Sequence, residues 1–405
     1  MRRGTTLFLA VVLLAFTAQA AWECIGPEGG PITHLARSTV DDQTLYAVTG
    51  SYPFKLLRSQ DEGQNWENVG SCNGYPYGMD VGADDVIYVG GSGATYVSTD
   101  GGGTWSTNYQ SYHYFYSIAA DPNDPDVAHA SGYVYDSGDY SMAAMTTTDG
   151  GSSWTTTELE SDARGRCVAV SCADPDRVLA GGYITTSYTP ALYLSTNGGA
   201  SWTDVTPAGS SGDYYMQSVG FHPTDPDIAL AGTYYGVYRT TNCGASWTET
   251  QSQYYNYTMD YSPADADVVL CGGYNGVYRS TDGGLGWNQY SSGLTGNYFD
   301  AAEVSPVDAT LAYVGNDEGF FRSTDTGVTW EASNSGIIVG EVLAYCWDDA
   351  SSTLYKSMVD LGIYKTDSYG SGWEQMTMPL ACGDVCGIAV SPTDPDVILA
   401  LEGDG

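Results

Sequence analysis

The clearest shortage in this chain is positive charge. Only 13 of its 405 residues are Lys or Arg, against 49 Asp and Glu, which gives a formal net charge of −36. Such an acidic surface repels the phosphates of nucleic acids and the headgroups of anionic lipids. We therefore expect no nucleic-acid partner.

Long runs that favour helix are also scarce, whereas Gly and Tyr are abundant at 51 and 34 residues. This composition suits many short strands joined by glycine turns. After residues 1–20, no segment has the length and hydrophobicity of a membrane-spanning helix. The sequence therefore predicts an all-β protein without a membrane span.

Metal-ligand patterns are weak. No CxxC pair occurs, and the four histidines are scattered without ligand spacing. Acidic proline turns such as 121–126 and 222–227 offer carboxylates at close spacing, so calcium stays an open alternative. Their spacing does not match an EF-hand, and proline-anchored Asp turns form without metal. We expect no cofactor and no metal.

The first twenty residues predict a signal peptide. Arg2 and Arg3 precede an apolar run over 7–16, and Ala18-Gln-Ala20 forms a small-residue cleavage site. We therefore expect a secreted or cell-surface protein with a mature chain of 21–405.

Nine cysteines fit such an oxidising compartment. The sequence neighbours Cys167 with Cys172 and Cys382 with Cys386 are the first disulfide candidates. Because the count is odd, one thiol stays free or has a partner outside this sequence.

One motif organises the chain: Ser/Thr-x-Asp-x-Gly-x-x-Trp occurs eight times, with tryptophans 39 to 49 residues apart. This period is typical of a repeat architecture. The third-position residues are Asp61, Asp100, Asp149, Asn197, Asn242, Asp282, Asp325 and Ser368. The closing tryptophans are Trp66, Trp105, Trp154, Trp202, Trp247, Trp287, Trp330 and Trp373.

The motif favours a structural role. An Asp or Asn side chain accepts hydrogen bonds from nearby backbone, glycine supplies positive φ, and tryptophan covers the turn. Three copies replace the acid, which a catalytic acid would not tolerate. We interpret the motif as a staple for a hairpin turn.

These residues resemble the Asp-box, or BNR repeat, found in sialidases, xyloglucan-hydrolysing glycosidases, sortilin-type receptors and photosystem II assembly factors. The resemblance covers nearly the whole mature chain. It implies a β-propeller of four-stranded blades, with each box on the turn between the third and fourth strands. Enzymes and binding proteins share this fold, so the resemblance alone does not give the function.

The repeat count leaves the ring size open. Eight complete units are present, and residues 388–401 supply the first two strands of a ninth before the chain stops at Gly405. We expect a reading frame truncated at its C-terminus. The blade number is eight, nine, or seven with the start of a second ring.

Function is expected on the face opposite the boxes. The resemblance implies that loops between second and third strands, and between successive blades, meet there. These loops are rich in tyrosine, whose flat ring and polar tip suit a sugar or a protein epitope, although tyrosine also packs between strands. The predicted ligand-binding residues are Tyr214, Tyr215, Tyr234, Tyr235, Tyr254, Tyr255 and Tyr274.

The enzyme alternative has fewer supporting residues. No sialidase-type Arg-Ile-Pro motif occurs, and residues 48–51 carry no acid where the similar xyloglucan-hydrolysing enzymes have a catalytic aspartate. Asp317 and Asp360 lie in comparable loops and are candidates for an inverting pair. We favour a binding module for polysaccharide or an extracellular protein, with a glycoside hydrolase acting on a β-glucan or xyloglucan-like polymer as the alternative.

Overall fold

The structure is a computed structural model. It describes residues 30–136, 138–252, 255–335 and 337, together with the strand segments 342–348, 353–358, 362–366, 374–376, 385–391 and 394–402. The regular elements of the described part are strands, apart from two short 3-10 turns at Ala83–Asp85 and Ser210–Gly212. None of its helices has the length and hydrophobicity to cross a membrane. The predicted all-β class is confirmed.

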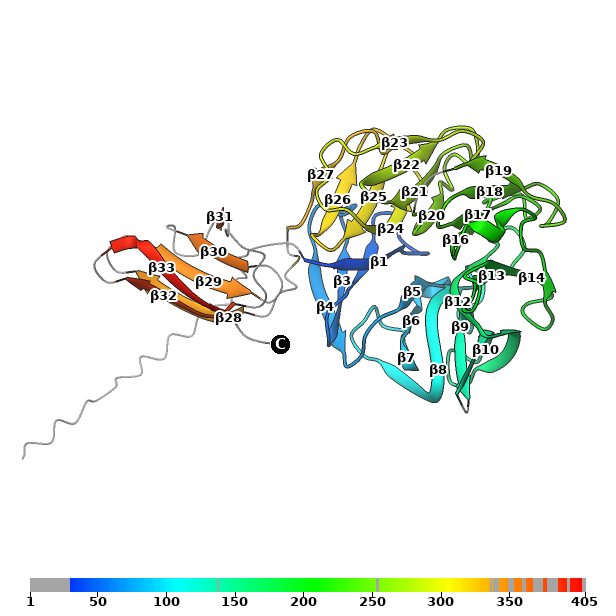
Figure 1. Ribbon diagram of the computed structural model, residues 1–405, viewed down its shortest axis with the longest axis horizontal. Coiled ribbons are helices and arrows are strands. Elements are labelled where there is room, and N and C mark those ends of the chain that lie inside the picture. Colours follow the sequence, from blue (N-terminus) through cyan, green and yellow to red (C-terminus); the bar gives the residue numbers. More distant parts are fainter. Residues whose placement is uncertain are drawn as a thin grey trace, which may run out of the picture.

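Six antiparallel sheets form a ring, seen along its axis in Figure 1. Five of them have four strands in sequential order. The first contains β1 (Ile32–Arg37), β2 (Leu45–Thr49), β3 (Phe54–Ser59) and β4 (Glu67–Cys72). The others contain β12 (Ala163–Val170), β13 (Arg177–Ile184), β14 (Pro190–Thr196) and β15 (Thr203–Asp204); β16 (Met216–Phe221), β17 (Ala229–Thr233), β18 (Val237–Thr240) and β19 (Thr248–Gln251); β20 (Thr258–Tyr261), β21 (Val269–Gly273), β22 (Gly276–Ser280) and β23 (Asn288–Tyr290); β24 (Phe299–Val304), β25 (Ala312–Asn316), β26 (Phe320–Ser323) and β27 (Glu331–Ala332).

The sixth sheet has seven strands because one strand serves twice. Its strands are β5 (Gly78–Val81), β6 (Ile87–Gly90), β7 (Ser92–Ser98), β8 (Ser106–Ala120), β9 (Val127–Asp136), β10 (Asp139–Thr148) and β11 (Thr155–Ser161). The first part of β8 pairs with β7 and the second part with β9. The sheet thus has the pattern of two four-stranded blades that share β8.

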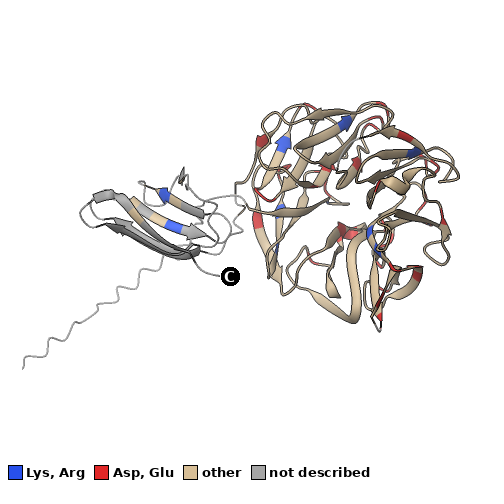
Figure 2. Cartoon of the chain, viewed as in Figure 1, with Lys and Arg blue, Asp and Glu red and all other residues tan. Residues whose placement is uncertain are grey.

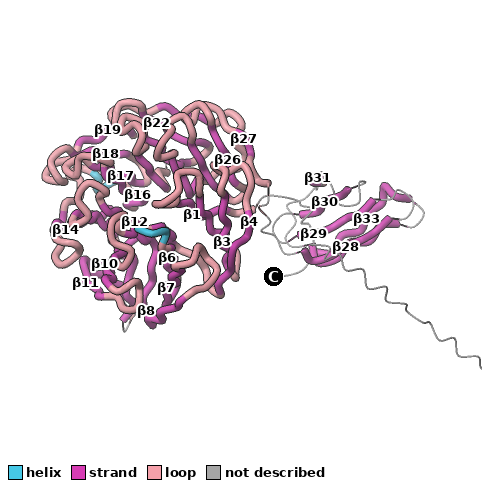
Figure 3. Tube along the Cα trace, turned by 180° about the vertical axis from the view of Figure 1, so that it is seen from behind, coloured by secondary structure: helices cyan, strands magenta, loops and turns pink. Residues whose placement is uncertain are grey.

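The ring closes where β1 meets β24 through hydrogen bonds from Arg37 to Glu303 and to the Val304 carbonyl. A further sheet contains β28 (Val342–Asp348), β29 (Thr353–Met358), β30 (Gly362–Thr366) and β31 (Glu374–Gln375), and a hairpin contains β32 (Val385–Ser391) and β33 (Asp394–Glu402). Both lie beside the ring and not in it (Figures 1 and 3). The sequence left the ring at eight blades, nine blades, or seven with the start of a second ring. A ring of eight or nine blades is not confirmed, since the last complete repeat lies outside the closed ring.

The box turns join the third and fourth strands, as the resemblance implied. Ser280 Oγ donates to Asp282 Oδ1 over 2.7 Å and accepts from Gly284 N over 2.9 Å. Asp282 Oδ1 also accepts from Gly286 N over 2.8 Å. The equivalent hydroxyl-to-acceptor bond is present at Asp61, Asp100, Asp149, Asn197, Asn242 and Asp325.

The substituted boxes explain why Asn is tolerated. In the Asn197 turn, Oδ1 accepts from Ser201 N, and Nδ2 donates to Ser201 Oγ over 2.9 Å. In the Asp149 turn the bond to the equivalent hydroxyl runs the other way, from Ser153 Oγ to Asp149 Oδ2. A serine hydroxyl serves both arrangements because it can donate or accept. Trp373 and Ser368 of the eighth copy lie outside the described residues.

The expected Cys167–Cys172 disulfide is not formed, because both residues are free thiols. Cys167 lies on β12 and packs in the apolar core between blades with Leu179 and Met216. Cys172 follows the strand, is exposed, and lines the central cavity. The strand between them therefore carries the two thiols to different environments. Cys382 lies outside the described residues, so the second predicted pair stays a prediction.

Candidate functional site

The predicted tyrosines come together on one face of the ring. Tyr214 and Tyr215 precede β16, and Tyr234 and Tyr235 form the turn between β17 and β18. The ring centroid of Tyr214 lies 5.9 Å from that of Tyr234 and 5.4 Å from that of Tyr235. Tyr254 lies outside the described residues.

The contacts continue into the next blade. The centroid of Tyr255, just before β20, lies 4.2 Å from that of Tyr234 and 5.4 Å from that of Tyr274, in the β21–β22 turn. Tyr234 also donates its hydroxyl hydrogen to the Tyr255 oxygen, and this bond raises the pKa of Tyr234. The six predicted tyrosines that the structure describes thus form one connected group.

Four tyrosines outside the predicted ligand-binding set extend this group. Tyr183 and Tyr188 join one end, and Tyr257 and Tyr298 join the other. We call the connected set the tyrosine arc: Tyr183, Tyr188, Tyr214, Tyr215, Tyr234, Tyr235, Tyr255, Tyr257, Tyr274 and Tyr298. Tyr188, Tyr214, Tyr274 and Tyr298 are between 37 and 48% exposed, so the arc offers ring surface to a ligand.

Part of the arc is held in an uncommon backbone conformation. Tyr188, Tyr214 and Tyr255 have φ values of 58°, 63° and 65°. A bulky side chain rarely adopts positive φ, and such residues persist only where their surroundings enforce them. In the β17–β18 turn, Thr233 Oγ1 accepts hydrogen bonds from the backbone of Tyr235 and Gly236. Local hydrogen bonds therefore hold the β17–β18 turn of the arc in a defined conformation.

A second tyrosine cluster covers β8, β9 and β10. Tyr114 stacks on Tyr133 at 4.3 Å between ring centroids, and Tyr133 meets Tyr140 edge-on at 5.3 Å. Tyr116 stacks on Tyr77 of the preceding blade at 4.9 Å. The blades β5–β8 and β8–β11 thus carry their own aromatic surface.

Two arginines on β12 lie between the cluster and the arc. The Arg164 guanidinium lies 4.9 Å from the ring centroid of Tyr133 and 4.2 Å from that of Tyr140. The Arg166 guanidinium lies 5.6 Å from the centroid of Tyr183 and 5.2 Å from that of Tyr215. Arginine stacks favourably on aromatic faces, so these residues join the two aromatic groups.

Five inner strands carry a β-bulge at the same place. The register shifts across Thr33, Tyr116, Arg166, Gln217 and Asp300. A bulge re-aims the extra side chain, and in one case this brings two bulged residues of neighbouring blades into contact. Arg166 Nη1, for example, donates to Gln217 Oε1 over 3.1 Å. The bulges were not predicted, because no residue pattern marks them.

Asp317 was predicted to pair with Asp360, but the structure places Asp300 near Asp317 instead. Asp317 lies in the β25–β26 turn, and Asp360 lies outside the described residues. On β24, Asp300 is the bulged residue beside the Asn316 end of β25. Burial and the nearby Asp317 charge raise the pKa of Asp300. Sequence analysis missed Asp300, since nothing in the repeat distinguishes it from scaffold.

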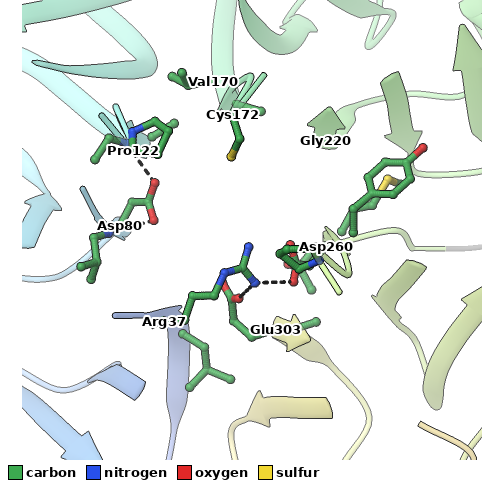
Figure 4. A pocket seen from close by; sticks show the side chains of 18 of the residues that line it. Arg37, Asp80, Pro122, Val170, Cys172, Gly220, Asp260 and Glu303 are labelled. Carbon is green, nitrogen blue, oxygen red and sulfur yellow. Dashed lines mark hydrogen bonds and ion pairs between the residues drawn. The ribbon is translucent and has the colours of Figure 1, made fainter. Parts of the chain in front are cut away.

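A central cavity of about 630 Å³ runs between the inner strands, toward the acidic proline turns (Figure 4). Arg37 Nη1 donates to Glu303 Oε2 over 2.6 Å and to Asp260 Oδ2 over 3.1 Å. Asp80 faces this group across the cavity, and burial raises its pKa to about 6.

The cavity carboxylates also satisfy backbone groups of neighbouring blades. Asp80 Oδ2 accepts from Ala120 N over 2.9 Å, and Asp260 Oδ2 accepts from Val304 N over 2.8 Å. Each carboxylate thus accepts a hydrogen bond from a backbone amide of another inner strand. This contact gives Asp80 and Asp260 a structural role. Among the described residues, no group of three or more His, Cys, Asp or Glu is arranged to hold a metal ion.

Comparison with known proteins agrees with this geometry. The model of the BNR/Asp-box repeat matches residues 96–107, which include the second box. The chain is a β-propeller with Asp-box repeats. No curated protein matches it significantly.

Solved structures show the same fold at low sequence identity. The GH74 xyloglucanase from Xanthomonas campestris has a TM-score of 0.70 at 15% identity, covering 94% of this chain and 65% of that one. An ancestral GH74 enzyme has a TM-score of 0.72 at 16% identity, covering 96% of this chain and 60% of that one. YCF48 bound to D1 peptide has a TM-score of 0.52 at 16% identity, covering 73% of this chain and 92% of that one. The Asp-box propeller thus spans under two thirds of the length of either GH74 structure.

Proposed function

We propose that this Asp-box propeller is a secreted or cell-surface binding module that holds a glycan or protein ligand on the tyrosine arc. The observation that carries this proposal is the connected set of tyrosines across successive blades, with four rings at least 37% exposed. Aromatic rings bury much apolar area at small entropic cost and are enriched where proteins bind ligands. The predicted signal peptide at 1–20 supports secretion.

The backbone of the arc adds to this support. Three of its tyrosines have positive φ, a conformation that costs stability and tends to occur at functional sites. The solved neighbours are compatible with either ligand class, since one is a xyloglucanase and another is bound to a peptide.

The test removes exposed rings without touching the core. Tyr274 and Tyr298 are exposed, contact each other at 5.4 Å, and have ordinary φ values, so a double Tyr→Ala variant should fold. We expect the variant to lose at least tenfold in affinity for polysaccharides or secreted proteins that the wild type retains on an array. Tyr109→Ala is the matched control, since Tyr109 is 80% exposed but lies on the outer half of β8. If the wild type, the double variant and Tyr109→Ala all bind the same ligands equally well, the tyrosine arc is not the binding site.

Glycoside hydrolysis is the second candidate, favoured by the Asp300 and Asp317 pair. Glycosidases require two carboxyl groups, one of them a general acid, and the raised pKa of Asp300 suits that acid role. Asp300 lines the central cavity and follows Tyr298 of the arc by two residues. Release of reducing ends from a β-glucan by the wild type, lost in both Asp300→Asn and Asp317→Asn, would establish this activity. Ligand retention without reducing ends would leave the binding function alone.

A further inference from the structure

Four of the eight arginines of the ring form an ion pair, and the two between the tyrosine groups are not among them. Arg37, Arg58, Arg177 and Arg322 each form an ion pair with a carboxylate. Over the residues that the structure describes, neither Arg164 nor Arg166 does. Figure 2 shows how sparse basic residues are among the acidic ones. Arg239 and Arg279 also form no ion pair within the described part of the chain, but each is the only arginine on its strand, whereas Arg164 and Arg166 lie together on β12.

The surroundings hold both guanidinium groups and leave donors open. Arg166 Nη1 is bound by Gln217 Oε1, whereas its other guanidinium nitrogens have no hydrogen-bond partner among the described residues. Arg164 has only its two tyrosine contacts there, and its Nε is a buried donor without an acceptor. Aromatic contacts fix the guanidinium plane without using its donors, so both groups stay able to bind an anion.

The bulge on β12 places the two arginines differently. Because Arg166 is the extra residue between Gly165 and Cys167, it contacts Tyr183 and Tyr215, whereas Arg164 contacts tyrosines of β9 and β10. Two guanidinium groups with open donors therefore lie two residues apart, with exposed rings continuing from one of them along the arc. That arrangement suits an extended polymer with repeated acidic groups and stackable rings.

We propose that Arg164 and Arg166 form a carboxylate-binding subsite that selects an acidic polysaccharide, one containing uronic acid residues, as the ligand of the tyrosine arc. The inference rests on the proposed binding function and narrows it. The planar arginine fork pairs with a carboxylate through two parallel hydrogen bonds, while the sugar ring stacks on tyrosine. Charges farther away than about 8 Å are largely screened at physiological ionic strength, so the net negative charge does not prevent this contact.

The test compares one polymer with and without its charge. Binding of the full chain to a polyuronate, and to the same polymer after its carboxyl groups are reduced to alcohols, is measured by affinity electrophoresis and calorimetry. We expect the reduced polymer to bind at least tenfold more weakly, and Arg164→Gln or Arg166→Gln to remove most of this difference. Arg166→Lys keeps the charge but not the planar fork, so this variant should retain only part of the difference in binding between the charged and the reduced polymer.

Arg279→Gln is the matched control. The Arg279 guanidinium also stacks on a tyrosine, Tyr290, and its Nε also lacks an acceptor, but it lies on the third strand next to a box turn. This variant should bind the polyuronate like the wild type, and melting temperatures check that all variants fold. If Arg279→Gln weakens binding as much as Arg166→Gln, the subsite is wrongly placed.

The outcomes separate the two proposals. Equal binding of charged and reduced polymer, unchanged in the arginine variants, would overturn the subsite and leave the tyrosine arc as a binding face. Binding of polyglutamate but not polyuronate through the same arginines would overturn the polysaccharide in favour of an acidic peptide. If the tyrosine variant also shows no change with any ligand, the proposed function itself fails.

Discussion

Arg37 on the first strand of the ring donates to Glu303 on its last blade over 2.6 Å, although 266 residues separate them in the sequence. The same nitrogen donates to the Val304 carbonyl over 3.0 Å. These bonds join β1 to β24, where the chain itself provides no connection. The closure of the ring therefore uses these polar bonds together with an apolar core that Ile32 and Trp66 share with Phe320 across the same junction.

Arg37→Met should destabilise the ring by about 2–4 kcal/mol, because it leaves the poorly solvated Glu303 and Asp260 carboxylates without their counter-charge. Denaturant unfolding gives this loss directly. Combining the change with Glu303→Gln should cost less than the sum of the single variants, since the second change removes the unpaired charge. Additive losses would show that the contact does not close the ring.

Thr147→Ala tests the box as a structural staple. The Thr147 hydroxyl donates to Asp149 and accepts from the buried amide of Gly151, so its loss should cost about 1–3 kcal/mol. Asp149→Asn should cost much less, because Ser153 can accept from an amide as Ser201 does at Asn197. Thermal melting of both variants is the measurement. A greater loss for Asp149→Asn than for Thr147→Ala would contradict the staple.

Asp80 should lower stability as pH rises from about 4 to about 6. Its folded pKa of about 6 lies above the ordinary value of 3.8, so the unfolded chain loses the proton first and unfolding becomes easier through this range. The contribution is on the order of 3 kcal/mol. His34, whose pKa burial lowers to about 4, acts in the opposite direction.

The difference between wild type and Asp80→Asn isolates this effect. At the acid end of that range, the unfolding free energies of the two proteins should differ only by a constant offset. As pH rises, the difference should change increasingly in favour of the variant. Parallel curves would mean that Asp80 ionises normally in the folded ring.

Native alkylation should distinguish the free thiols by burial. Cys172 is exposed and should react in the folded protein, whereas Cys167 and Cys271 are buried and should react only after unfolding. Burial also raises the pKa of Cys167 to about 12, which leaves almost no reactive thiolate. Peptide mass mapping without reductant gives the result. A Cys167–Cys172 linked peptide would restore the disulfide that the sequence suggested.

The sequence was most informative where a local pattern has a local cause. The box residues predicted their turns because each hydrogen bond, such as Ser280 to Asp282, lies within five residues. The clustering of Tyr214, Tyr234 and Tyr274 followed from their equivalent loops. Both predictions needed only the repeat and the strand order.

The ring size could not be read in the same way. Every repeat has similar strands, so nothing in a single unit tells whether β24 packs against β1 or another blade follows. That choice depends on contacts such as Arg37 with Glu303. Similarly, Arg166 and Asp300 became notable only through the bulges that re-aim them. One sequence signal could have pointed to β12. Arg58, Arg239, Arg279 and Arg322 each directly precede a box, whereas Arg164 and Arg166 do not.

The strand that two blades share has a mechanical consequence. Because β8 pairs with β7 along its first part and β9 along its second, backbone hydrogen bonds run unbroken from β5 to β11. Elsewhere a loop joins one blade to the next, so a single blade can loosen while its neighbour stays ordered. The seven-stranded sheet has no such joint. Its amides should exchange with solvent together, as one cooperative unit, and fraying of the ring should begin elsewhere.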